Sequence, residues 1–95
     1  MGDAEMSNPF ELELAHLEAE RKRLDALLDD AVAQYALVEE DMNVRMKAAS
    51  PAQLQELMAE RARIEESLGI AALVDAIDAL RDRMALIRSA AAAAA

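Results

Sequence analysis

Apolar residues recur along residues 9–49 at alternating steps of four and three, a spacing that one face of an α-helix produces and a β-strand does not. This heptad stripe consists of Phe10, Leu14, Leu17, Arg21, Leu24, Leu28, Ala31, Tyr35, Val38 and Met42. A stripe that continues for more than four heptads indicates a helix packed along its whole length. We therefore predict a helix over residues 9–49, roughly 60 Å long at 1.5 Å per residue.

Two similar helix-start signals occur, NPFE at residues 8–11 and SPAQ at residues 50–53. Each places a capping side chain before a proline and a Glu or Gln three residues after the cap, so that the two can satisfy each other's free backbone N–H groups. Pro51 also disfavours helical geometry at the residue before it, so the first helix should end near Ala48 or Ala49. The Ser50-Pro51 pair therefore predicts a corner between two helices.

The second half of the chain carries two more apolar stripes, separated by Gly69. The first is Leu54, Leu57, Arg61, Ile64 and Leu68, and the second is Ile70, Leu73, Ile77, Leu80, Met84 and Ile87. In a straight helix they would point about 150° apart, so a single continuous arm could not press both against the first helix. Either Gly69 caps a helix and the chain turns, or the helix continues and its distal half faces another partner. We predict a break or sharp bend, with helices over residues 51–68 and 70–88.

The fold class predicted from these patterns is all-α, either an antiparallel helical hairpin or a three-helix coiled-coil-like bundle with a long first helix. A composition with 31% charged residues, two Gly and two Pro, rich in Ala, Leu, Glu and Arg, is typical of long helices. Residues 1–8 are assigned to a flexible N-terminal segment, residues 9–89 to one helical domain, and residues 90–95 to an alanine tail.

Arginine interrupts two of the stripes. In an antiparallel hairpin that turns at residues 49–51, paired positions sum to about 100, which places Arg61 opposite Glu39 and Glu40. Folding the last segment back similarly brings Arg21 near Asp78 and Asp82. The alternative is that both arginine stems lie along the stripe while their charged ends reach water.

Charge and composition exclude several classes of function. The formal net charge of -9 disfavours nucleic-acid binding, which needs clustered Lys and Arg. The basic run at residues 21–23 is flanked by acidic residues at 18, 20 and 25, a spacing that favours ion pairs within the helix. The absence of Cys excludes disulfide and thiol chemistry. With no apolar run long enough for a membrane span and no signal segment, we expect a soluble, cytoplasmic protein.

One pattern resembles a catalytic or metal motif, the Glu13-x-x-His16 step on one helical face. Paired copies of this step build di-iron sites in helical bundles, but this chain has one His. An oligomeric metal-binding bundle, in which a symmetric dimer supplies the missing half, is therefore only a remote alternative. Because the sequence has no Gly-rich phosphate loop and no Ser-His-acid arrangement, we predict no enzyme activity and no cofactor.

Residues 50–70, SPAQLQELMAERARIEESLGI, resemble the second-helix region of the small helical co-chaperones of type III secretion needle subunits. The matching residues are Pro51, Gln53, Gln55, Leu57, Glu65 and Leu68-Gly69-Ile70. The resemblance covers about a fifth of the chain, whose first helix is longer and whose residues 73–87 continue beyond the usual end of such proteins. It implies an antiparallel hairpin packed by Leu54, Leu57, Ile64 and Leu68. Its outer face would meet a larger helical-repeat chaperone, and together they would keep the needle subunit from polymerising early.

The helices carry more apolar surface than one copy of the chain can cover. A second, alanine-rich row lies opposite the heptad stripe and comprises Leu12, Ala19, Ala26, Ala33, Leu37 and Val44. Its small residues would allow another helix to approach closely, although Ala is also common in helices for its high helix propensity alone.

We therefore predict a non-enzymatic helical adaptor or co-chaperone that buries an amphipathic stripe against a protein partner. The alternative is a coiled-coil structural protein whose partner is a second copy of itself. The candidate partner-binding residues are Leu54, Leu57, Ile64, Leu68, Leu73, Ile77, Leu80, Met84 and Ile87.

Overall fold

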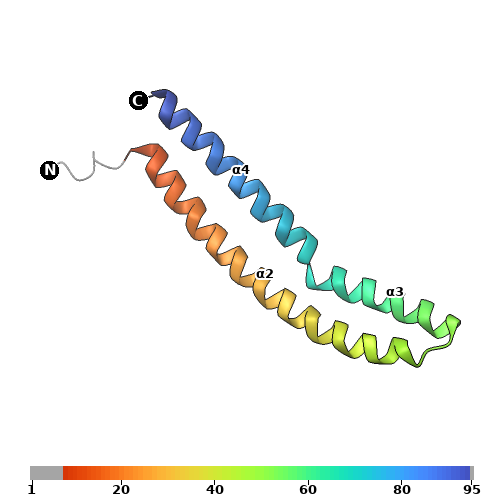
Figure 1. The fold of residues 1–95 in the computed structure, drawn as a ribbon. Helices are drawn as coiled ribbons and strands as arrows, with labels where there is room; N and C mark the ends of the chain where they lie inside the picture. Colours follow the sequence, from red (N-terminus) through yellow and green to blue (C-terminus); the bar gives the residue numbers. More distant parts are fainter. Residues whose placement is uncertain (1–7, 95) are drawn as a thin grey trace.

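The computed structural model describes residues 8–94, which form the helices α2 (Pro9–Lys47), α3 (Pro51–Leu68) and α4 (Ile70–Ala94). Figure 1 shows α3 and α4 lying one after the other along α2 and running in the opposite direction. The molecule is elongated, with extents of 71 × 23 × 15 Å. The predicted all-α class is confirmed for the described residues. Residues 1–7 of the predicted flexible segment lie outside them.

Both predicted helix starts are present with their caps. The side chain of Asn8 accepts a hydrogen bond from the Glu11 amide at 2.8 Å, and Pro9 follows the cap directly. At the second start the Gln53 amide donates to the Ser50 hydroxyl at 3.3 Å, while the Ser50 amide donates to the Gln53 side chain at 3.0 Å. This reciprocal pair satisfies two backbone donors that the first turn of a helix leaves free.

The first helix ends at Lys47, two residues before the predicted end at residue 49. The Ala48 amide still donates to the Arg45 carbonyl, at 3.2 Å, but Ser50 is already extended, with φ -72° and ψ 166°. Pro51 forces that extended geometry on the residue before it. The chain then needs Ala48 and Ala49 as well to reverse its direction, so the helix stops earlier than the proline alone requires.

Gly69 ends α3 in the left-handed conformation, with φ 72° and ψ 23°. Its amide donates to the Glu66 carbonyl at 3.0 Å, and its carbonyl accepts from the Leu73 amide at 2.9 Å. One residue therefore closes α3 and opens α4, so the chain bends without reversing (Figure 1). The predicted break or bend at Gly69 is confirmed. This bend turns the out-of-phase stripes of α3 and α4 toward the same side.

The apolar core lies mainly between α2 and α4. Its buried members are Ala31, Met42, Ile77, Met84 and Ile87. Every residue of the α2 heptad stripe is buried or half-buried, whereas α3 has no buried residue. Three of the five buried residues therefore lie on α4, whereas the contact of α3 with α2 has its buried side chain, Met42, on α2.

The last helix continues to Ala94 and does not end at the predicted residue 88. Residues 90–94 are all Ala, the residue with the highest intrinsic helix propensity, and nothing in their sequence stops a helix. The alanine tail assigned to a separate segment is part of α4 as far as residue 94.

The Gly69 conformation gives a first prediction. A Cβ at this position would meet no atom within 4 Å, so a substitution costs free energy through the positive φ alone. Replacing Gly69 by Ala should lower the free energy of unfolding by about 1–2 kcal/mol. Replacing it by Asn, which tolerates the left-handed region better, should cost less. Urea unfolding followed by circular dichroism measures both; an Ala variant more stable than the native chain would mean that the bend is not the preferred state.

The uneven burial of α4 gives a second prediction. Met84 is 3% exposed and Leu86, on the same helix, is 65% exposed. Truncating Met84 to Ala should lower the free energy of unfolding by about 2–5 kcal/mol, because it leaves a cavity against α2. Truncating Leu86 to Ala should change it by no more than about 0.5 kcal/mol. Equal losses in chemical unfolding of the two variants would contradict the packing of α4 on α2.

Candidate protein-binding surfaces

The predicted partner-binding residues lie on the faces of α3 and α4 that pack against α2. Ile77, Met84 and Ile87 are 3–5% exposed. The remaining residues are half-buried, namely Leu54, Leu57, Ile64, Leu68, Leu73 and Leu80. These side chains cover one another within the chain, so a partner that used them would have to displace α2. Their role in binding a second protein stays a prediction.

A polar cluster around Arg61 joins α3 to α2. The guanidinium lies 2.7 Å from the Glu39 carboxylate, and its Nε donates to the Tyr35 hydroxyl at 2.8 Å. The same hydroxyl donates to Glu65 at 3.3 Å. The hydrogen bond to Tyr35 is the main cause that raises the pKa of Arg61, whose guanidinium, like that of any arginine, is charged at ordinary pH. The predicted pairing of Arg61 with Glu39 is confirmed, whereas Glu40 makes no ion pair within residues 8–94.

Arg21, predicted to lie near Asp78 and Asp82, makes no ion pair with either of them within residues 8–94. Arg21 pairs with Glu18 and Asp25 on its own helix. Carboxylates three and four residues away on one helix lie next to the guanidinium, so Arg21 can pair with them without contacting a second helix.

The hydrogen bond from Arg21 lowers the pKa of Glu18. The stabilising effect of this pair is therefore present at neutral pH and is lost as the pH falls through the lowered pKa of Glu18.

An ion pair that the sequence analysis missed joins the open ends of the two arms. Arg83 of α4 donates to Glu13 of α2 at 2.8 Å. The positions sum to 96, close to the antiparallel register of about 100, so the register rule could have found the pair. Glu13 therefore bonds to α4, and His16 is exposed. In the described part of the chain no three or more His, Asp or Glu side chains are grouped so that they could hold a metal ion.

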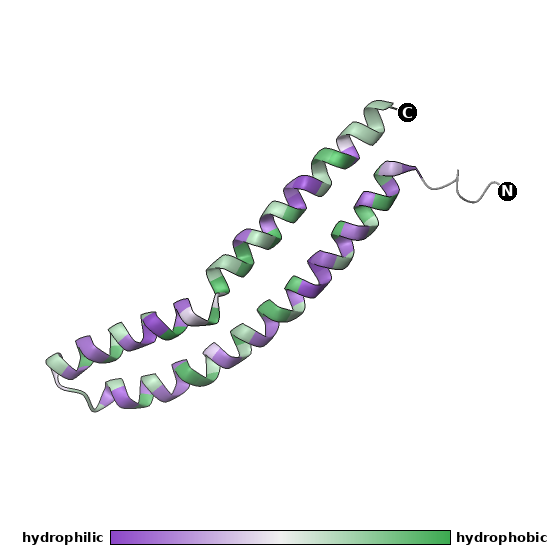
Figure 2. Ribbon diagram, turned by 180° about the vertical axis from the view of Figure 1, so that it is seen from behind, coloured by the Kyte–Doolittle hydropathy of each residue, from purple (hydrophilic) through white to green (hydrophobic). Residues whose placement is uncertain are grey.

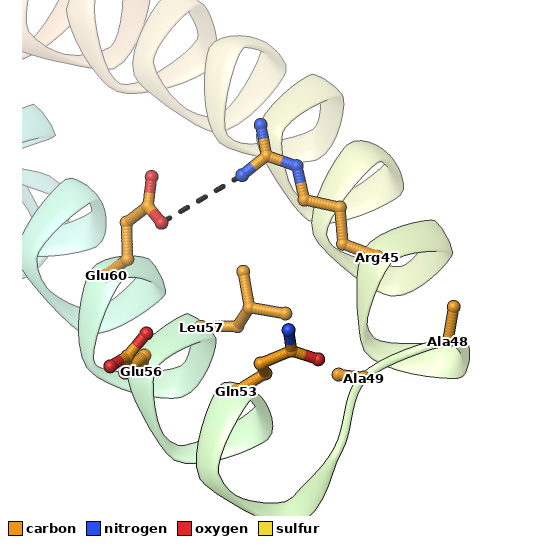
Figure 3. A pocket seen from close by; sticks show the side chains of 7 residues that line it. All are labelled: Arg45, Ala48, Ala49, Gln53, Glu56, Leu57 and Glu60. Atoms are coloured by element: carbon orange, nitrogen blue, oxygen red, sulfur yellow. Dashed lines mark ion pairs between the residues drawn. The ribbon is translucent and has the colours of Figure 1, made fainter.

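Two hollows lie where the arms separate. The one beside the turn has a volume of about 370 Å³ and is lined by Arg45, Ala48, Ala49, Gln53, Glu56, Leu57 and Glu60. Figure 3 shows Arg45 and Glu60 facing each other from opposite arms, with their charged groups 3.9 Å apart. The second hollow, about 490 Å³, lies at the bend and is lined by Leu27, Asp30, Ala31, Gln34, Ser67, Leu68, Gly69, Ala72 and Leu73. Both hollows are open, and the Ser67 hydroxyl at the second donates to the Ile64 carbonyl at 2.8 Å.

The most exposed apolar surface is the row on the far side of α2, which we call the outer row. All six members, Leu12, Ala19, Ala26, Ala33, Leu37 and Val44, are exposed. The exposed fraction reaches 70% at Leu37 and 66% at Val44. Figure 2 shows hydrophobic and hydrophilic residues alternating along α2, as expected of a helix with apolar residues on more than one face. The predicted position of this row, opposite the heptad stripe, is confirmed.

Comparisons of the chain with protein-family models, curated proteins and solved structures found no match. No helix in residues 8–94 combines the length and the apolar composition that crossing a membrane requires. The surfaces described above therefore have to be interpreted from their own chemistry. They present apolar and charged side chains on helices, and such surfaces are commonly used to bind other proteins.

The Arg61 cluster gives a third prediction. Reversing either charge alone, by Arg61→Glu or by Glu39→Arg, should place like charges side by side and lower the urea midpoint. The double variant should recover part of the loss because the pair re-forms in the opposite sense. Unfolding of the double-mutant cycle measures the coupling. A double variant no more stable than the weaker single one would mean that the two side chains do not interact in solution.

Proposed function

We propose that this protein is a non-enzymatic helical adaptor or co-chaperone that works as an antiparallel hairpin with a bent second arm. One observation carries the proposal: Leu37 and Val44 are 70% and 66% exposed on a helix whose opposite face is already packed. Fully burying a Leu or Val side chain is worth about 1.5–3 kcal/mol, so a partner that covers this row gains binding free energy from each residue. The outer row is thus a second apolar face that the chain itself leaves uncovered.

The arrangement of the helices supports the more specific proposal of a co-chaperone in type III secretion. The resemblance at residues 50–70 implies a hairpin packed by the α3 stripe, with an outer face free for a chaperone. In this structure the α3 stripe is half-buried against α2, and the outer row is exposed. In this proposal the longer α2 and the additional α4 would lengthen the surface that the hairpin offers.

Self-assembly is a second candidate function, favoured by exposed apolar residues on the other arm. Leu86 of α4 is 65% exposed and Met58 of α3 is 55% exposed. Exposed apolar residues on both arms would allow copies of the chain to associate side by side through more than one face.

The mass of the purified chain in solution separates the two functions and is the fourth prediction. At micromolar concentration we expect the mass of a single chain from sedimentation equilibrium. We also expect binding of a hydrophobic dye that decreases when Leu37 and Val44 are both replaced by Ser. The matched control, Leu86→Ser, leaves the outer row intact and should therefore keep the dye binding that the outer row causes. A stable homodimer or larger assembly would contradict the adaptor function and support self-assembly.

The adaptor function also has a direct test in cells of the source organism. A photo-crosslinking amino acid at position 37 should yield an adduct with one defined protein other than a second copy of the chain. The same amino acid at position 75, an exposed site on α4, is the control for random encounters. Adducts with the chain itself from position 37 would contradict the adaptor function.

A further inference from the structure

We propose that the outer face of α2 over residues 26–44 binds a basic amphipathic helix of a partner protein. This inference rests on the proposed adaptor function and adds to it the binding face and the chemistry of the partner. Two independent features of this stretch carry it: the exposed apolar row and the distribution of charge around that row.

The stretch contains no Lys or Arg between Leu24 and Val44. The carboxylates between Leu24 and Val44 are Asp25, Asp29, Asp30, Glu39, Glu40 and Asp41. Three of them are neutralised within the molecule, because Asp25 pairs with Arg21, Glu39 with Arg61, and Asp41 with Arg45.

The other three carboxylates, Asp29, Asp30 and Glu40, are exposed and take part in no ion pair in the described part of the chain. Asp30 only accepts a hydrogen bond from Gln34, at 2.8 Å. The chain therefore leaves uncompensated negative charge on the same face as the apolar row.

The geometry of the helix places these charges on both sides of the row. At about 100° per residue, Ala26, Ala33, Leu37 and Val44 fall within about 40° of one another. Asp29 and Glu40 lie on one side of this row, and Asp30 lies on the other. A helix laid along the row would meet apolar side chains in the middle and carboxylates along both edges. Lys and Arg beside an apolar stripe are the matching pattern.

The length and side-chain size of the row also fit a helix. Residues 26–44 rise about 27 Å at 1.5 Å per residue, which matches a partner helix of roughly 18 residues. Ala26 and Ala33 leave room for the partner backbone at one end, whereas Leu37 and Val44 supply the apolar side chains at the other. Helices in contact lie about 8–10 Å apart, and small residues favour the shorter distance.

Charge disfavours a second copy of the chain on this face. Two copies packed antiparallel about the centre of the stretch would bring Asp30 of one near Glu40 of the other, at both ends. Like charges facing each other destabilise such a pair. The phosphates of nucleic acids and anionic lipids would be repelled in the same way. A basic protein helix is the occupant that satisfies both the apolar row and its acidic edges.

The test uses two synthetic helical peptides of about 18 residues with the same leucine stripe. One carries Lys beside the stripe, and the other carries Glu at the same positions. In fluorescence anisotropy at low ionic strength, the Lys peptide should bind the full chain at least about tenfold more tightly than the Glu peptide. Its affinity should fall as salt is added.

Variants of the chain locate the binding face. Replacing both Leu37 and Val44 by Ala should weaken binding of the Lys peptide by about tenfold or more. Replacing Asp30 by Asn and Glu40 by Gln should weaken it by about three- to tenfold at low salt and flatten the salt dependence. The matched controls are Leu86→Ala for apolar surface, and Asp75→Asn with Asp78→Asn for net charge, both on α4. Circular dichroism checks that each variant keeps its helix content.

Three results would overturn the inference and leave the adaptor function standing: no binding of the Lys peptide, equal binding of the Glu peptide, or equal weakening by the α4 control variants. A different result would remove both proposals. If the purified chain is a dimer that Leu37→Ala with Val44→Ala converts to single chains, the outer row serves self-association.

Discussion

The packing of two out-of-phase stripes against one helix depends on the backbone conformation of Gly69. In a straight helix the stripes of α3 and α4 would point about 150° apart, so only one of them could meet α2. The left-handed conformation of Gly69 changes the direction of the chain at the point where the phase changes, and both stripes then face α2. A residue with a Cβ adopts this conformation only at a cost in free energy. Two features of the sequence therefore indicate the bend: the change of phase between the stripes, and the glycine between them.

The contacts of α2 with α4 and with α3 depend on different interactions. Along α4 the buried residues Ile77, Met84 and Ile87 face α2, so apolar burial dominates. Beside α3, which has no buried residue of its own, Met42 of α2 is buried, Arg61 joins Tyr35 and Glu39, and Arg45 joins Glu60. Exposed ion pairs add little stability, but their geometry distinguishes one register from its neighbours. The end near the turn therefore combines one buried side chain with its capping box and its polar pairs.

Much of this fold follows from sequence spacing, and the exceptions share a cause. The heptad stripe, both caps, the bend at Gly69 and the Arg61–Glu39 pair depend on intervals between residues, which helix geometry converts directly into positions. The end of α2 at Lys47, with Ala48 as its cap, lies within two residues of the predicted end, whereas the ion-pair partners of Arg21 do not follow from the register because carboxylates on its own helix compete for it. For Arg21, two carboxylates on its own helix are closer than any carboxylate across the hairpin. The candidate binding residues were placed on stripes that the chain uses for its own packing, because spacing identifies an apolar face but not what covers it.

The remaining apolar face, the outer row, has the properties of a surface kept available for another protein. Leu37 and Val44 would promote non-specific association if neutral residues surrounded them. Glu40 lies beside both of them on the helix, and Asp29 and Asp30 lie beside the alanine end of the row. These carboxylates oppose contact between identical copies while favouring a partner of opposite charge. The acidic edges thus have two effects: they repel a second copy of the chain, and they leave the row accessible to a basic helix. In this interpretation the heptad stripe of α2 builds the hairpin, and its opposite face selects the partner.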